Sequence, residues 1–144
     1  MANVTTAPVE RSIQSVLIRG AYATVLAVAV NVLLVIAAGM LEIAPGFQPI
    51  SVPPVVFLSA VGAIGATVVY WLLLRYTTHP DKTFVRVSAV VLVLSFVPDV
   101  VLLLVDPAAT VPGVILLMAM HVVVAGAVIG LLVYWKRGDG VRKL

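Results

Sequence analysis

Three side chains capable of acid–base or hydrogen-bond chemistry occur inside long apolar stretches of this 144-residue chain. Asp99 follows Pro98 in SFVPDVVLLL. His121 lies in MAMHVVVAG, and Asn31 lies in VNVLLV. A carboxyl and an imidazole can share a proton, and a side-chain amide can both donate and accept hydrogen bonds. Because such groups are rare in apolar segments unless they have a partner or a function, they are the first candidates for a site.

The sequence excludes several other kinds of chemistry. It contains no cysteine, so it has no disulfide, no thiolate metal site and no cysteine nucleophile. No Walker, Rossmann, HExxH or GxSxG motif occurs. Met118 shares a helical face with His121, but the second histidine, His79, is expected across the membrane from both. We therefore expect no metal and no cofactor, and we expect that the protein is not an enzyme.

The composition places most of the chain in lipid. Hydrophobic residues make up 62% of the sequence and charged residues only 10%, whereas soluble domains contain about 25% charged residues. Four apolar stretches reach the roughly 20 residues that a helix needs to cross the hydrocarbon. The expected spans are residues 20–41, 55–74, 87–105 and 112–135, all within a single domain of residues 1–144. The predicted fold class is all-α: an antiparallel, up-down-up-down four-helix bundle in a membrane.

The positive charges predict an orientation. All nine Lys and Arg precede the first span, surround the second turn or follow the fourth span, and the first and third turns contain none. By the positive-inside rule both termini are expected to be cytoplasmic, in a bacterial-type inner membrane. The net charge of +3 then reflects topology, so we expect the lipid bilayer as a partner and no nucleic acid.

The most polar residues of the four spans are expected at one depth. Counted from the outer ends of the spans at about 1.5 Å per residue, they lie roughly 6–15 Å below the outer face. The predicted pocket or buried polar network consists of Asn31, Ser59, Ser95, Asp99 and His121. On the second span, Ser59, Ala63, Thr67 and Tyr70 also share one face, which we expect to turn inward.

The Pro98–Asp99 pair admits three interpretations. A carboxylate facing lipid at mid-membrane costs about 2.5–3.5 kcal/mol, so we expect Asp99 to face inward beside Asn31 or His121. Pro98 cannot donate a hydrogen bond to the carbonyl of Leu94, for which Ser95 or a water is a possible partner. The pair is therefore a structural kink with a neutral Asp, part of a functional pocket with His121, or a contact with a partner's helix.

Glycines predict the surfaces where helices approach closely. The candidate packing residues are Gly62, Gly65, Gly126 and Gly130, of which the last two form a GxxxG motif. The neighbouring helix can belong to the same chain or to another subunit. In the first turn, Phe47 and Ile50 are expected to fold back over the outer end of the bundle.

Three segments resemble a known group of proteins: LLMAMHVVVAGAVI, VPPVVFLSAVGAIGATVVYWLLLR and VRVSAVVLVLSFVP. They are similar to an uncharacterised family of small four-helix bacterial integral membrane proteins, over roughly residues 20–135. The resemblance implies the four-helix fold, and it implies that Met120–His121 and Pro98 are features of the family. It implies no activity.

The sequence leaves two kinds of function open. The leading hypothesis is an accessory or scaffold subunit that packs against the helices of other membrane proteins or of its own copies, as the glycine faces indicate. The alternative is a binder or carrier of a small lipophilic or cationic ligand, held in an outer-leaflet pocket near Asn31, Asp99 and His121.

Overall fold

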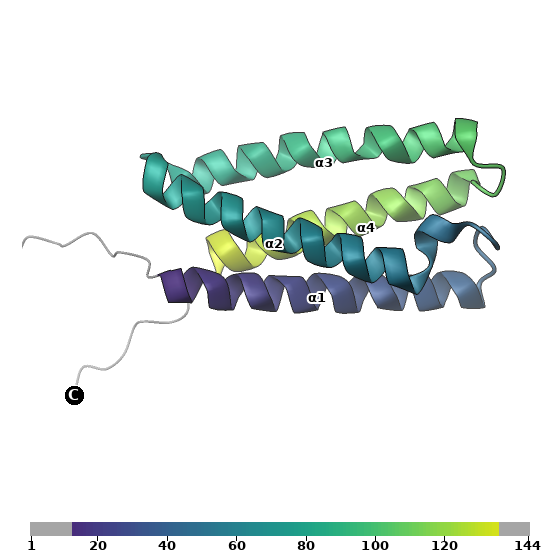
Figure 1. The fold of residues 1–144 in the computed structure, drawn as a ribbon, viewed down its shortest axis with the longest axis horizontal. Helices are drawn as coiled ribbons and strands as arrows, with labels where there is room; N and C mark the ends of the chain where they lie inside the picture. The colour runs from purple at the N-terminus through teal and green to yellow at the C-terminus, as the bar shows by residue number, and fades with distance from the viewer. Residues whose placement is uncertain (1–12, 136–144) are drawn as a thin grey trace, which may run out of the picture.

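The computed structural model describes residues 13–135, which form a bundle of four long helices (Figure 1). They are α1 (Ile13–Met40), α2 (Val52–Tyr76), α3 (Pro80–Val105) and α4 (Val111–Ile129). A short 3₁₀ turn, η1 (Gln48–Ile50), precedes α2, and α4 continues into a π-helical turn, η2 (Gly130–Tyr134). This described part contains no strand, so the predicted all-α, four-helix fold class is confirmed.

Each of the four helices is long and apolar enough to cross a membrane, with η2 counted as part of the fourth. The protein is therefore a multi-pass membrane protein. All four helices begin before the expected spans, and the difference is largest in α1, which begins at Ile13, and in α3, which begins at Pro80. The reason is that hydropathy predicts only the part of a helix that crosses the lipid. The start of the helix itself is favoured by proline in the first turn, as at Pro80.

The helix termini and connections define two ends of the bundle (Figure 1). The start of α1, the turn between α2 and α3, and the end of η2 lie at one end, and the other two connections lie at the opposite end. The described basic residues, Arg19, Arg75, Lys82 and Arg86, all lie on helix segments near the first end. Arg11, Lys136, Arg137, Arg142 and Lys143 lie outside the described residues.

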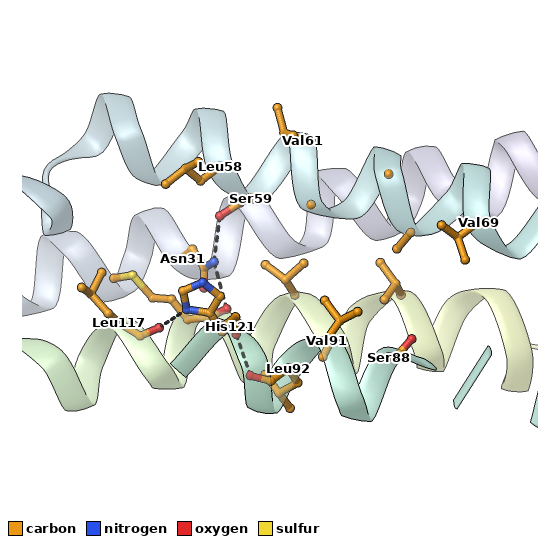
Figure 2. A pocket seen from close by; sticks show the side chains of 18 of the residues that line it. Asn31, Leu58, Ser59, Val61, Val69, Ser88, Val91, Leu92, Leu117 and His121 are labelled. Carbon is orange, nitrogen blue, oxygen red and sulfur yellow. Dashed lines mark hydrogen bonds between the residues drawn. The ribbon is translucent and has the colours of Figure 1, made fainter. Parts of the chain in front are cut away.

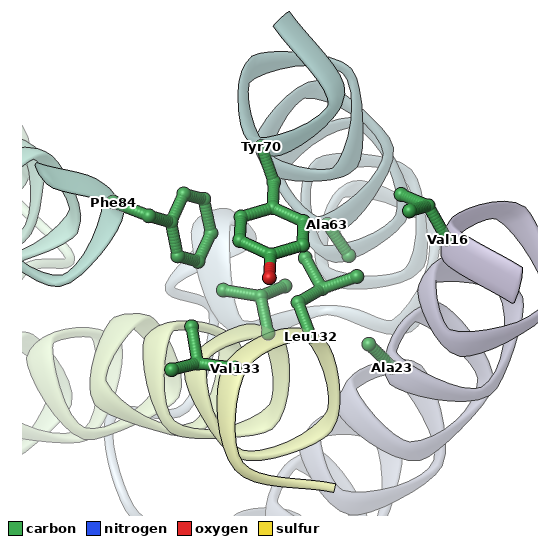
Figure 3. Close-up of a cluster of buried hydrophobic side chains, with 8 residues drawn as sticks. Val16, Ala23, Ala63, Tyr70, Phe84, Leu132 and Val133 are labelled. Atoms are coloured by element: carbon green, nitrogen blue, oxygen red, sulfur yellow. The ribbon is translucent and has the colours of Figure 1, made fainter. Parts of the chain in front are cut away.

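A tightly packed cluster joins α1, α2 and α4 near the first end (Figure 3). Tyr70 and Leu132 are fully buried there. Gly20 on α1 lies so close to Thr67 on α2 that an added Cβ would overlap the threonine side chain. Phe84 brings α3 into this cluster, with its ring edge-on to that of Tyr70 at a centroid distance of 5.0 Å. The predicted inward face of the second span, Ser59, Ala63, Thr67 and Tyr70, is buried as expected.

A second cluster closes the opposite end. Phe47 and Ile50, from the connection between α1 and α2, are buried against Val114 and Leu117 of α4. Close packing depends here on Gly113, because an added Cβ would lie 2.8 Å from that of Ala44. The prediction that this connection folds back over the bundle is confirmed.

The helices do not pack equally. α1 packs extensively against α2 and α4, and α3 packs mainly against α4. From their connecting turn, α2 and α3 diverge toward the other end of the bundle (Figure 1). Of all residues in α3, only Phe84 and Asp99 are buried. Phe84 and Asp99 are therefore the two fixed points of this helix, and every residue between them is partly or fully exposed.

Candidate functional site

Asp99 and His121 form a contact between α3 and α4. Nδ1 of His121 lies 3.2 Å from Oδ2 of Asp99. The carboxyl side chain is only 8% exposed, whereas the imidazole is 38% exposed. The expectation that Asp99 faces inward beside His121 is therefore confirmed. Nδ1 also lies 2.9 Å from the carbonyl oxygen of Leu117, one turn earlier on α4.

Asn31 of α1 connects α1 to α2 and α4, and its partner on α4, Met120, directly precedes His121. Its Nδ2 donates to Oγ of Ser59 on α2, at 2.8 Å, and to the carbonyl oxygen of Met120 on α4, at 3.3 Å. Asn31 is 1% exposed. Because the Met120 carbonyl can only accept, the amide atom facing it must be the nitrogen. Its Oδ1 has no hydrogen-bond partner among the described residues, and the same is true of Oδ2 of Asp99.

Ser95 does not take the role expected of it. Its Oγ donates to the carbonyl oxygen of Leu92 at 2.7 Å, not to that of Leu94. The hydroxyl of a serine in a helix reaches the carbonyl of the residue three or four positions earlier, here Leu92. The carbonyl of Leu94, directly before Ser95, points along the helix axis toward the next turn, out of reach of that hydroxyl. The helix nevertheless continues through Pro98.

A groove of about 500 Å³ lies between α2 and α3 (Figure 2). We call it the α2–α3 groove. Its α2 wall includes Leu58, Val61, Gly62, Gly65 and Val69. Its α3 wall includes Val87, Ser88, Val91, Leu92 and Ser95. Residues of α4, among them Leu117, His121, Val124 and Val128, form the floor.

The groove exists because α3 is attached at its two fixed points and α2 presents small residues between them. Gly65 and Ala66 line the groove where larger side chains would fill it. No atom lies within 4 Å of the position that a Cβ of Gly65 would take. Four of the five residues predicted for a pocket or polar network line the groove, namely Asn31, Ser59, Ser95 and His121, whereas Asp99 does not. The apolar length of the groove, with residues such as Val91 and Val124, was not predicted, because the divergence of two helices leaves no pattern in either sequence segment.

Both ends of the groove are blocked. Pro49 of η1 and Val55 line it at the end where the loop folds back, and Val55 is 5% exposed. Phe84, 1% exposed, lines it at the other end. Between these ends the rim is made of exposed aliphatic residues such as Leu58 and Val91. The open side therefore faces sideways between α2 and α3, toward the membrane hydrocarbon.

The groove is polar at one end and apolar along most of its length. Asn31, Ser59 and His121 gather at one end, and mostly aliphatic side chains line the rest (Figure 2). No Asp, Glu, Lys or Arg lines the groove within the described part of the chain, because Asp99 lies behind the imidazole. A groove of this kind suits a neutral molecule with a polar head and a hydrocarbon tail.

The four candidate packing glycines have different surroundings. A Cβ on Gly62 would lie 3.5 Å from Val124 of α4, which is ordinary contact. Nothing lies within 4 Å of such an atom on Gly65, Gly126 or Gly130. Within residues 13–135, no other helix therefore packs against the side of these three glycines on which a Cβ would lie. That another subunit packs against them stays a prediction.

Comparison with known families places the whole bundle in one of them. Residues 11–137 match a family of unknown function, DUF6069. The chain belongs to this family. The matched range includes all four helices and the groove, so it agrees with the predicted resemblance to a family of small four-helix membrane proteins. No curated protein and no solved structure matches the chain.

Membership in DUF6069 supplies no activity, so the argument for function rests on the site itself. The polar end of the groove, with Asn31, Ser59 and His121, and its apolar length both lie within the range that matches the family.

Proposed function

We propose that this protein is a non-enzymatic membrane protein that binds a small lipophilic molecule in the α2–α3 groove. The observation that supports this proposal most is the groove's form: about 500 Å³, blocked at both ends and bordered by exposed aliphatic residues. Its volume lies within the roughly 300–1,000 Å³ typical of small-molecule sites. A neutral ligand is favoured over a cationic one because no carboxylate lines the groove in the described residues.

The proposed route of entry is lateral. A molecule dissolved in the bilayer would pass between α2 and α3, because Pro49 and Phe84 obstruct the ends. The ligand would then leave the lipid without crossing water, and its polar head would be held at the depth of Asn31 and His121.

Two glycine substitutions test the proposal. Gly65→Leu places a side chain in the groove, where it meets no protein atom within 4 Å of the added Cβ. Gly126→Leu is a matched control, because it places the same side chain on an exposed face of α4 that is equally free of contacts. Each protein is extracted gently from its membrane, and native mass spectrometry measures any small molecule that is retained.

We expect a defined extra mass on the native protein and on the control variant Gly126→Leu. We expect this extra mass to be lost in Gly65→Leu. If the extra mass is absent from the native protein, or survives in Gly65→Leu, the groove is not a ligand site.

We further propose the orientation that the charges predict. The end bearing Arg19, Arg75, Lys82 and Arg86 would face the cytoplasm, in an inner membrane. Both termini would then be cytoplasmic, and the polar end of the groove would lie in the outer leaflet.

Assembly with another helix is a second candidate function, as an accessory or scaffold subunit. It is favoured by the exposed GxxxG motif of α4 and η2, where no described residue lies within 4 Å of an added Cβ on Gly126 or Gly130. Such a face allows another helix backbone to approach closely. The partner would be another membrane protein or a second copy of this chain. The same two variants test it: Gly126→Leu should abolish the assembly seen by native mass spectrometry, while Gly65→Leu should leave it intact.

A further inference from the structure

The hydrogen bonds of His121 fix which ring nitrogen carries a proton. Nδ1 lies 2.9 Å from the carbonyl oxygen of Leu117. A carbonyl can only accept a hydrogen bond, so Nδ1 must donate one and must carry a hydrogen. Oδ2 of Asp99 lies 3.2 Å from the same nitrogen but accepts no hydrogen bond. The Nδ1 hydrogen therefore points at the backbone, and in the neutral ring the other nitrogen, Nε2, has a free lone pair.

Nε2 is available to a ligand. The imidazole is 38% exposed and lines the α2–α3 groove. Within residues 13–135, Nε2 makes no hydrogen bond, since both polar contacts of the ring involve Nδ1. An acceptor that is left unpaired beside an apolar cavity loses the hydrogen bond that water would provide, so a donor placed there gains one.

Two other polar groups at this end of the groove, Asn31 and Ser95, already use their hydrogens. Nδ2 of Asn31 donates two hydrogen bonds, to Ser59 and to Met120. Oγ of Ser95 donates to Leu92. Asn31 and Ser95 are left with unused acceptor positions, as is Nε2 of His121. Oγ of Ser59 accepts from Asn31, and its own hydrogen has no acceptor among the described residues. This end of the groove therefore suits a hydroxyl, which can donate to Nε2 of His121 and also accept a hydrogen bond.

We propose that the ligand is a neutral lipophilic alcohol or phenol whose hydroxyl donates to Nε2 of His121, with its hydrocarbon lying along Val91 and Val124. This inference rests on the proposed function and adds the chemical class of the ligand. A charged amine or carboxylate head is disfavoured, because no charged side chain lines the groove in the described part of the chain. Asp99 lies on the Nδ1 side of the ring and does not touch the ligand.

The test compares two probes that differ only in the donor. Purified protein, stripped of lipid in detergent, is titrated with 1-dodecanol and with dodecyl methyl ether, and occupancy is measured by native mass spectrometry. The alkyl tails match, but the ether is the more lipophilic probe, so each affinity is corrected for that probe's own measured partition into the detergent. We expect the alcohol to bind roughly five- to tenfold more tightly, as for one neutral hydrogen bond. His121→Leu should remove this preference. His121→Gln, which keeps an amide oxygen near the position of Nε2, should retain part of it.

The outcomes separate this inference from the proposed function. Equal binding of alcohol and ether, lost in Gly65→Leu, would overturn the inference and leave the groove as a lipophilic site. Binding of neither probe to the native protein would overturn both. A readout independent of ligands is the ¹⁵N spectrum of the His121 ring, identified in a His79→Gln variant. A proton on Nδ1 alone is expected, and a proton on Nε2 of the neutral ring contradicts the inference.

Discussion

Oδ2 of Asp99 lies 3.2 Å from Nδ1 of His121, and this is one of two buried points that fix α3 to the bundle. The other is Phe84, whose ring packs edge-on against Tyr70. Between them α3 presents only partly or fully exposed residues, and the α2–α3 groove lies along this stretch. The same attachment thus stabilises the helix and leaves room for a ligand.

Removing the aromatic anchor should destabilise the protein. Phe84→Ala leaves a cavity in the cluster, and in well-packed cores this change costs roughly 3–5 kcal/mol. Val91→Ala, on the same helix but 58% exposed, should change the free energy of unfolding by only about 0.5 kcal/mol. Unfolding by SDS in mixed micelles, followed by circular dichroism, measures both. Equal effects would contradict the two-point attachment.

Asn31 and Ser59 should be energetically coupled. Their 2.8 Å hydrogen bond is buried between α1 and α2. Hydrogen bonds between membrane helices contribute about 0.6 kcal/mol on average and up to about 1.7 kcal/mol. A double-mutant cycle with Asn31→Ala and Ser59→Ala should give a coupling energy in this range. Additive effects of the two substitutions would mean that the hydrogen bond contributes nothing.

Gly20 should tolerate no side chain. In Gly20→Ala the methyl group overlaps Thr67, and such overpacking typically costs about 1–3 kcal/mol. Gly39→Ala is the control on the same helix, because nothing lies within 4 Å of its added Cβ. That change should be neutral or slightly stabilising, since alanine favours helix over glycine by about 1 kcal/mol. Thr67→Ala should partly restore the stability of Gly20→Ala, and a failure to do so would locate the clash elsewhere.

Single cysteines test the proposed orientation. The chain has no cysteine of its own, so each introduced thiol is unique. Gly46→Cys lies in the connection between α1 and α2, and Thr78→Cys lies in the turn between α2 and α3. In intact cells an impermeant maleimide should label the first thiol, and it should label the second only after lysis. The reverse pattern would place the termini outside.

Structural features that depend on a single helix could be predicted from the sequence. Period and hydropathy gave four helices, and the polar positions on α2 gave its buried face. Counting residues from the span ends placed Asp99 and His121 at one depth, and they are in contact. These predictions succeed because burial in a bundle follows helical spacing and depth.

Features that depend on how two helices meet were not predictable. A GxxxG motif marks a surface that permits close approach, yet within residues 13–135 nothing lies within 4 Å of an added Cβ on Gly126 or Gly130. The closely packed glycines are Gly20 and Gly113, which lie in no such motif. The groove arises from the divergence of α2 and α3, so only their three-dimensional arrangement reveals it.

Photolabelling tests the central claim most directly. The protein in native membranes is irradiated with an alkyl diazirine alcohol at low concentration, and the labelled residues are mapped by peptide mass spectrometry. If the α2–α3 groove binds lipophilic molecules, labels should concentrate on residues such as Leu58, Val91 and Val124, and excess 1-dodecanol should suppress them. Labels spread evenly over exposed residues outside the groove, such as Val25 and Leu33 on α1, and unaffected by competitor, would contradict the claim.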